Sequence, residues 1–329
     1  MILSVAPMMD YTDRHYRYLI RLLSRRTTLY TEMIPDSAIL LGNREKFLKF
    51  DESEHPVVLQ LGGSDANQLA KCARIGEDYG YNAINLNCGC PSDRVEKGNF
   101  GASLMATPEK VADIVEKIQK AVSIPVSVKH RIGIRSPSGL NKDQYSNLVE
   151  FVNIVSKSGI NHFIVHARIA VLAKLTPAQN RSIPPLDYNT VYQLKRDFRH
   201  LTIEINGGIS SLEESVEQLK YVDGVMIGRS AVNNPYLFAN ADQVFFNEKS
   251  TPLSRTEVIQ AYLPYVYKAM TDEKIRVHHA LRHVANLYSG QPGGRLFRRF
   301  LSEKIFTKKE DWQPNGLEKA MNEALSYSR

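Results

Sequence analysis

The sequence predicts a (β/α)8 TIM barrel followed by a C-terminal all-helical domain. Eight short apolar segments, most of them about 20 to 45 residues apart, alternate with segments whose apolar residues recur at the helical period. After residue 245 only helical patterns follow. Strand and helix alternating eight times is typical of a TIM barrel, for which about 250 residues is usual. An open doubly wound sheet is the alternative, but the segment after the first strand, "APMMDYTDRH", is not the Gly-rich turn such sheets carry.

The predicted strands lie in chain order at residues 4–9, 28–34, 56–63, 83–89, 125–133, 162–168, 201–208 and 223–230. Two of the helical segments between them have clear ends. The helix over 107–122 begins with Thr107 as its N-cap and Pro108 as its first residue. The helix over 143–159 ends at Gly159, a favourable C-cap residue.

The helical patterns after the barrel occupy residues 251–270, 275–290 and 293–308, separated by glycine and proline. We therefore expect a barrel domain over residues 1–245 and a helical domain over residues 246–329.

The charge is concentrated in the last quarter of the chain. The net charge is +7, and residues 252–329 hold 13 Lys and Arg against 8 Asp and Glu. A polyanion would be attracted there, although a solvated basic surface is the plain alternative. The chain has three cysteines, no apolar run near the roughly 18 residues that span a bilayer, and no signal-peptide pattern. We expect a cytoplasmic protein with reduced thiols and no membrane segment.

Polar residues, glycines and two methionines lie where the predicted strands end, which is where barrel enzymes carry their chemistry. They are Met8, Met9, Gln60, Asn85, Asn87, Cys90, Lys129, Arg131, His166, Arg168, Asn206, Gly207, Gly208, Gly228 and Arg229. Structural explanations exist for single members. Gln60 could tie two strands together, Lys129 could form an ion pair, and His166 could be a satisfied core histidine.

Two glycine motifs after strands seven and eight, "NGGI" and "IGRSA", indicate a phosphate site. Glycine lets backbone N–H groups approach an oxyanion, and Arg229 offers a bidentate partner. Flavin mononucleotide (FMN) would satisfy the whole rim. Its ring would meet Gln60, Lys129 and His166, and a cation at its N1/O2 edge favours the reduced anionic form.

These residues also match a family. The chain resembles the bacterial tRNA-dihydrouridine synthases, most closely the type that acts on U20 and U20a. The matching stretches run from about residue 5 to 303 and include "APMMDYTDRHYR", "NCGCPSDRV", "GNFGASLM", "VSVKHRIGI", "FIVHAR", "DGVMIGRSAVNNPYLF" and "GGRLFRRFLSE". The combination of "GCPS" with "GASLM" is the most specific of these.

The resemblance implies an FMN-binding barrel over residues 1–245 and a helical tRNA-binding domain over 246–329. It implies that FMN contacts Pro7, Met8, Met9, Gln60, Lys129, His166, Asn206, Gly207, Gly208, Gly228 and Arg229. Cys90 matches the family's proton donor, and Asn87 matches an asparagine that faces the substrate base.

The implied reaction is reduction of uridine, expected at U20/U20a in the tRNA D-loop, to 5,6-dihydrouridine. Hydride passes from N5 of FMN to C6 of uracil, NADPH supplies the electrons, and Cys90 gives a proton to C5. An ordinary thiol is mostly protonated at pH 7, so it can act as an acid. The stacked nucleotide must be extruded to reach the site.

We expect tRNA to be the macromolecular partner of a monomeric protein without a metal. Its predicted contacts are Arg168, Arg181 and the helix face of Arg295, Arg298 and Arg299, with Arg282 and the neighbouring histidines of "HHALRH" nearby. One segment departs from the family pattern "HARKAWL-x-G". Here Ile169 replaces a lysine, Val171 a tryptophan and Lys174 a glycine, so Lys174 or Arg181 would have to supply the cation.

Two other functions remain open. A flavin reductase of a small molecule would leave the basic helical tail without a role. An RNA-binding chaperone that had lost its chemistry would not need Cys90, Lys129, His166 and the phosphate motifs.

The sequence "CGC" at residues 88–90 has four readings. A metal site lacks further ligands, and a disulfide across one residue is strained and unsuited to a reducing cell. Strand alternation points Asn85 and Asn87 to the barrel axis and Cys88 to the helices. Cys90 lies past the strand, at the rim, and is the reactive candidate, whereas Cys88 and Cys72 are expected to be packing residues.

Overall fold

The computed structural model describes residues 1–92, 98–136, 141–249, 251–307 and 312–327. Two of the sequence patterns run past these limits, "NCGCPSDRV" at residues 93–95 and the third helical pattern at residue 308. The chain divides into two compact units. The barrel unit comprises Met1–Thr12, Thr28–Ile209 and Glu213–Gly228, and the helical unit comprises Asp13–Thr27, Ser210–Leu212 and Arg229–Arg329.

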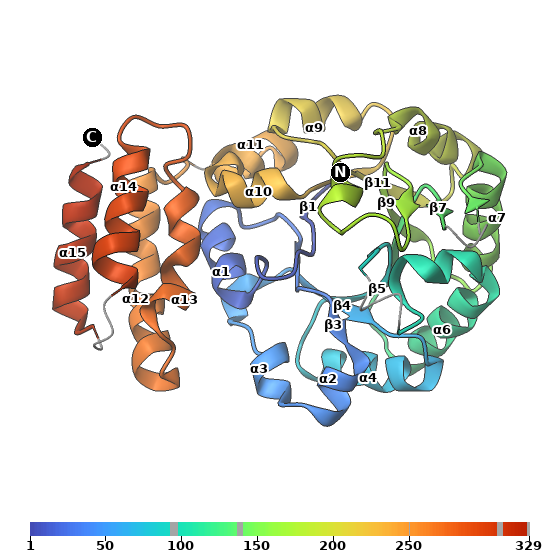
Figure 1. Ribbon diagram of the computed structural model, residues 1–329, viewed down its shortest axis with the longest axis horizontal. Coiled ribbons are helices and arrows are strands. Elements are labelled where there is room, and N and C mark those ends of the chain that lie inside the picture. Colours follow the sequence, from blue (N-terminus) through green and yellow to red (C-terminus); the bar gives the residue numbers. More distant parts are fainter. Residues whose placement is uncertain (93–97, 137–140, 250, 308–311, 328–329) are drawn as a thin grey trace. The chain divides into compact units, whose positions relative to one another are not determined.

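Parallel strands form a closed barrel, as the sequence predicts (Figure 1). In sheet order they are β1 (Ile2–Val5), β12 (Gly224–Ile227), β11 (Thr202–Asn206), β9 (His162–His166), β6 (Val126–Arg131), β5 (Ala83–Cys88), β4 (Val57–Gly62) and β2 (Leu29–Tyr30). A parallel bridge between Ser4 and Thr28 joins β1 to the β2 side of the ring. The short strand β3 (Ile34–Pro35) also pairs with β4.

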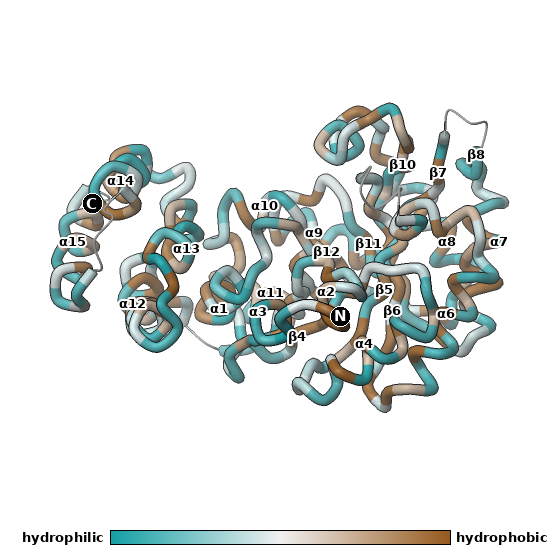
Figure 2. The backbone as a smooth tube through the Cα atoms, turned by 60° about the horizontal axis from the view of Figure 1, so that its bottom comes forward, coloured by the Kyte–Doolittle hydropathy of each residue, from teal (hydrophilic) through white to brown (hydrophobic). Residues whose placement is uncertain are grey.

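Amphipathic helices surround these strands. They are α2 (Asp36–Leu41), α3 (Arg44–Leu48), η1 (Glu52–Glu54), α4 (Ala66–Asp78), η2 (Gly101–Ala106), α6 (Pro108–Ala121), α7 (Tyr145–Ser156), η3 (Gln179–Arg181), α8 (Tyr188–Asp197) and α9 (Leu212–Gln218). Apolar and hydrophilic residues alternate along the outer helices α4, α6 and α7 (Figure 2). Their apolar faces cover strands that are buried on both sides, as parallel strands are.

The helix predicted over 107–122 begins where the sequence places it, with one chemical difference, whereas α7 ends at Ser156 with Lys157 as its C-cap, before the predicted Gly159. Thr107 precedes α6 and Pro108 begins it, but the Thr107 hydroxyl bonds back to the Leu104 carbonyl at 3.4 Å and caps no N–H of the helix. After α7, Gly159 takes a positive φ of 94°, which suits glycine.

Side chains alternate between the interior and the helices along each strand. Ala6, Tyr30, Val58, Ile164 and Met226 form an apolar cluster inside the barrel. Toward the carboxyl ends of the strands, polar side chains such as Gln60 and Asn85 continue the buried interior.

A second, small sheet lies in the loops that follow β6 and β9. It joins β7 (Ile134–Arg135) to β10 (Ala170–Val171) in parallel and to β8 (Asn141–Lys142) in antiparallel pairing. These pairings connect two loops at the carboxyl end of the barrel, so the loops there are not independent of each other.

The helical unit holds the predicted C-terminal helices together with an early one. Its helices are α1 (Arg14–Leu23), α10 (Arg229–Asn233), η4 (Pro235–Asn240), α11 (Ala241–Phe246), α12 (Arg255–Glu273), α13 (Val277–Leu281), η5 (Arg282–Asn286), α14 (Gly294–Phe300), η6 (Leu301–Phe306) and α15 (Pro314–Ser326). Ser254 and Glu257 form a reciprocal capping box at the start of α12. No helix in the described ranges has the length and apolar character needed to cross a membrane.

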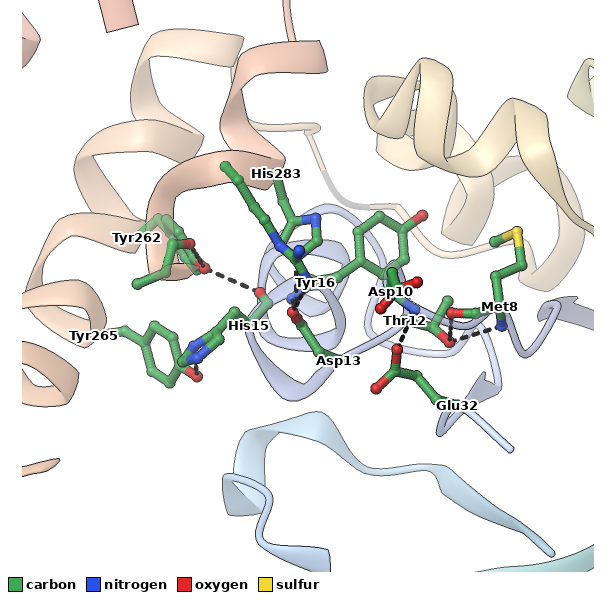
Figure 3. A network of polar contacts seen from close by, with 12 residues as sticks. Met8, Asp10, Thr12, Asp13, His15, Tyr16, Glu32, Tyr262, Tyr265 and His283 are labelled. Atoms are coloured by element: carbon green, nitrogen blue, oxygen red, sulfur yellow. Dashed lines mark hydrogen bonds and ion pairs between the residues drawn. The ribbon is translucent and has the colours of Figure 1, made fainter. Parts of the chain in front are cut away.

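Within this unit α1 is tied to η5 by one carboxylate (Figure 3). Asp13 caps α1 by accepting the Tyr16 N–H at 2.9 Å, and it also contacts Arg282 at 2.6 Å and His283 at 3.0 Å. Burial alone would raise the pKa of Asp13, but the hydrogen bond and charge of His283 outweigh it and hold the pKa below its usual range. Arg282 and His283, predicted to lie near tRNA contacts, therefore have an internal structural partner.

Candidate active site at the barrel rim

A chain of amide side chains crosses the barrel interior near its carboxyl end. Gln60 on β4 donates to Asn85 on β5 at 2.7 Å, and Asn85 donates to Ser127 on β6 at 2.8 Å. Asn87 donates to the other end of Gln60, its carbonyl oxygen, at 2.8 Å. Because each amide uses both ends, the orientation of Gln60 and Asn85 is fixed before any ligand binds. Gln60 does tie two strands together, and its contact with a flavin remains a prediction.

The carboxamide oxygen of Asn87 organises the loop that carries Cys90. It accepts the N–H of Gly89 at 3.1 Å and the N–H of Cys90 at 3.0 Å. The Cys90 carbonyl accepts the N–H of Ala102 at 2.9 Å, which secures the loop from its other side. The Cys90 thiol remains half-buried and lies 3.6 Å from the Ser92 hydroxyl. Asn87 therefore positions Cys90, whatever further contact it makes with a substrate base.

The three cysteines differ as the strand pattern predicts, and all three are free thiols. Cys88 is fully buried, and burial raises the pKa of its thiol. Cys72 in α4 is also buried, and burial raises the pKa of its thiol to about 12. A proton donor must reach solvent or substrate, so Cys90 is the one cysteine placed for that role.

Lys129 on β6 directs its ammonium across the rim to Asn206 on β11. The Nζ–Oδ1 distance is 3.1 Å, and Asn206 in turn donates to the Met226 carbonyl on β12 at 2.8 Å. Burial, with a smaller contribution from the nearby charge of Arg131, lowers the pKa of Lys129 to about 8. A rim lysine with a perturbed pKa is typical of a functional site.

The "NGGI" turn leaves room for its backbone N–H groups to approach a phosphate or another anion. Gly207 and Gly208 both have positive φ, 120° and 76°. A Cβ on Gly207 would lie 2.7 Å from the His166 ring, and one on Gly208 would lie 2.5 Å from Leu186. Only glycine lets the backbone take this path beside His166. Gly228 ends the barrel unit, and Arg229 begins the helical unit as the first residue of α10.

The first loop of the barrel makes a tight turn that begins at Met8 (Figure 3), and Met9 follows it in the chain. The Met8 N–H donates to the Thr12 hydroxyl at 3.0 Å, and Asp10 takes a positive φ of 67° while its N–H bonds to Glu32. Pro7 and Met8 are partly buried, whereas Met9 is 52% exposed. The predicted flavin contacts in this loop remain predictions.

Buried Arg131, at the end of β6, reaches the segment after β5 and the segment after β9. Its guanidinium donates to the carbonyl oxygens of Gly89, Ile169 and Asn180, each at 3.0 Å. The sequence marks Arg131 as a rim residue but gives no sign of these partners.

The loop that departs from the family pattern is ordered by Asn180. Its side chain accepts the Val171 N–H at 2.8 Å and donates to the carbonyls of Val171 and Leu175, both at 2.9 Å. Val171 is thereby part of strand β10, and Lys174 is exposed. Sequence reasoning missed Asn180, which only its burial reveals.

The predicted tRNA contacts fall in both units. In the barrel unit Arg168 is buried and donates to the Pro184 carbonyl, and Arg181 is exposed. In the helical unit α14 carries Arg295 and Arg299, both exposed, and the half-buried Arg298. Arg299 approaches Glu303 at 4.0 Å, an exposed pair of little energetic weight.

A cavity of about 600 Å³ lies at the opposite, amino-terminal end of the barrel strands, among residues that include Ile2, Ala83 and Val126. TIM-barrel chemistry occurs at the carboxyl ends of the strands, so this cavity lies away from the candidate active site. Among the described residues no group of three or more His, Cys, Asp or Glu side chains is placed to hold a metal ion.

A closed parallel barrel with a half-buried lysine, a double-glycine turn and a half-buried thiol on one rim is typical of a TIM-barrel oxidoreductase of the flavin type. Residues 4–325 match the family described as dihydrouridine synthase (Dus). The chain therefore belongs to the dihydrouridine synthase family.

Two relatives agree with this placement, and a solved structure agrees with the fold. The chain is 54% identical over 301 residues to the tRNA-dihydrouridine(20/20a) synthase of Synechocystis sp., covering 92% of this chain and 88% of that one. It is 52% identical over 301 residues to the protein of the same name from Salmonella typhi, covering 91% and 89%. A 2-naphthoyl-CoA reductase structure has a TM-score of 0.54 at 12% identity, covering 73% of this chain and 50% of that chain, which supports the fold alone.

The pKa of Lys129 predicts how flavin binding depends on pH. Below about pH 8 the side chain is a cation, and above it the cation is progressively lost. We expect the affinity of the apoprotein for FMN to fall by roughly five- to tenfold between pH 7 and pH 9, measured by flavin fluorescence quenching. In Lys129→Arg the guanidinium stays charged, so its affinity should stay flat over this range. Equal affinities of the wild type at both pH values would contradict a role for the Lys129 charge.

Proposed function

We propose that this protein reduces uridines 20 and 20a of tRNA to 5,6-dihydrouridine, with FMN as cofactor and NADPH as electron donor. One observation carries the proposal beyond the family. A free, half-buried thiol, Cys90, is held over the barrel rim by Asn87, on the same rim as Lys129 and the double-glycine turn. The names of the 50–54% identical relatives support the choice of U20 and U20a.

The residues present fit FMN. The Gly207–Gly208 turn offers a backbone path without side chains for the phosphate end, and Arg229 follows Gly228 as a cation for the same group. Lys129 and His166 would lie along the ring system. Bound FMN supplies a hydride for C6 of the uracil ring.

The protein's own contribution is the second half of the reduction. Cys90 donates its proton to C5 of the reduced pyrimidine, on the strength of its free thiol and its place past the end of β5. Asn87 keeps that loop in position through its two N–H contacts. Gln60 and Asn85 keep Asn87 itself from rotating, because the three amides form one hydrogen-bonded chain.

The helical unit supplies charge for a polyanion. Its α14 presents Arg295, Arg298 and Arg299 within two turns, and Arg168 and Arg181 belong to the loop after β9. Such contacts give affinity and orientation through phosphates, while the site reads the extruded base. A small-molecule substrate would leave the arginines of α14 without a function.

Position-resolved mass mapping tests the proposed function. Purified holoprotein, NADPH and an unmodified tRNA transcript carrying uridine at 16, 17, 20 and 20a should give a mass gain of two hydrogens at 20 and 20a alone. A transcript with cytidine at 20 and 20a is the control and should gain none. Gain at 16 or 17 instead would contradict the assigned positions, and no gain by flavin-loaded protein would contradict the activity.

Charge reversal on α14 tests the proposed tRNA contact. We expect Arg298→Glu/Arg299→Glu to weaken tRNA binding by about 10- to 100-fold and to flatten its salt dependence by roughly one unit of slope for each phosphate that is no longer neutralised. FMN content should stay unchanged. Lys120→Glu, an exposed reversal on α6 of the barrel unit, is the matched control. Equal tRNA affinity of the double variant and this control, measured by filter binding at several salt concentrations, would exclude the contact.

A further inference from the structure

Arg131 is a buried cation that contacts three carbonyl oxygens in two separate segments of the chain. It is 3% exposed, and its Nε donates to the Gly89 carbonyl while one terminal nitrogen donates to the carbonyls of Ile169 and Asn180. These carbonyls belong to the loop after β5 and to two points in the segment after β9. One planar guanidinium therefore sets the spacing between the Cys90 loop and the loop that departs from the family pattern.

Hydrogen bonds from two side chains hold the Cys90 loop in place. Asn87 binds the N–H groups of Gly89 and Cys90, and Arg131 binds the carbonyl of Gly89. The loop also lies against β6, because a Cβ on Gly89 would lie 3.5 Å from the backbone of His130. The peptide unit that precedes the thiol is thus fixed at both its N–H and its C=O.

The electrostatic setting of Arg131 gives it a second role. A buried guanidinium whose partners are neutral carbonyls is costly, and a nearby anion would offset that cost. Burial is the main cause that lowers the pKa of Arg131 to about 10; negative charge on Cys90 opposes the shift, and the charges of Arg181 and Arg168 add to it. The guanidinium contacts the carbonyl of Gly89, the residue directly before Cys90, so it lies beside the segment that carries the thiol.

We infer that Arg131 is the positioning residue for proton donation: it fixes the Cys90 loop and stabilises the thiolate that proton transfer leaves behind. The inference rests on the proposed function. In the step concerned, the S–H bond of Cys90 breaks and a C–H bond forms at C5 of the pyrimidine carbanion. The electron pair of the S–H bond stays on sulfur, and a proton from water later restores the thiol.

Two substitutions separate placement from charge. Arg131→Lys keeps a charge but cannot reach three carbonyls with one ammonium. We expect its turnover to fall about tenfold and its Cys90 alkylation rate to stay within threefold of wild type. Arg131→Met loses both functions, so turnover should fall by 100-fold or more and alkylation of Cys90 by iodoacetamide by about tenfold. Arg135→Met, which removes an exposed arginine on β7 paired with Asp143, is the control and should match the wild type.

The measurements are peptide-resolved alkylation by mass spectrometry, FMN content, melting temperature and dihydrouridine formation in holoprotein. Alkylation and turnover of Arg131→Met within twofold of wild type would overturn the inference. Equal loss of FMN, melting temperature and turnover in both variants would also overturn it, since that pattern marks a purely structural residue. If Arg131→Met does not fold, Arg131→Lys alone decides: wild-type turnover by this variant would overturn the inference. Failure of the proposed function is distinguishable, because wild-type protein would then form no dihydrouridine while alkylation could still be compared.

Discussion

The side chain of Asn87 is the contact on which the site depends. Its amide nitrogen belongs to the hydrogen-bonded chain inside the barrel, and its oxygen holds the two N–H groups that precede the Cys90 side chain. A strand buried on both faces thereby fixes the position of a residue in a loop. Barrel enzymes commonly carry catalytic residues on loops. A loop residue that donates a proton needs such an anchor to keep the geometry of the transfer.

The rim holds two cations in positions that cost stability. Lys129 and Arg131 are cations in a low-dielectric setting with amide and carbonyl oxygens as partners, and burial lowers the pKa of both. Neither arrangement is what packing alone would favour. Apolar residues such as Ile164 and Met226 fill the interior below and supply the compensating burial.

The sequence predicts the parts of this protein that depend on local pattern. Strand positions follow from short apolar segments, and Gln60, Lys129 and Asn206 are recognisable because they end such segments. Contacts across long sequence separations are not recognisable in that way. The Arg131 partners lie 38 to 49 residues away, and the Asp13 carboxylate meets His283 across 270 residues. The sequence alone therefore groups His283 with the predicted tRNA contacts, whereas in the fold it is a buried structural partner. The placement of α1 in the helical unit depends on the same long-range contacts.

The central claim is that Cys90 is the acid of the reaction, and single-turnover dihydrouridine formation by Cys90→Ala tests it most directly. The account predicts a fall of about 100- to 1,000-fold, within the range of general acid catalysis, with FMN and tRNA binding unchanged. Cys72→Ala, which removes a buried thiol in α4, should react at the wild-type rate. A Cys90→Ala protein that forms dihydrouridine as fast as the wild type would contradict the account.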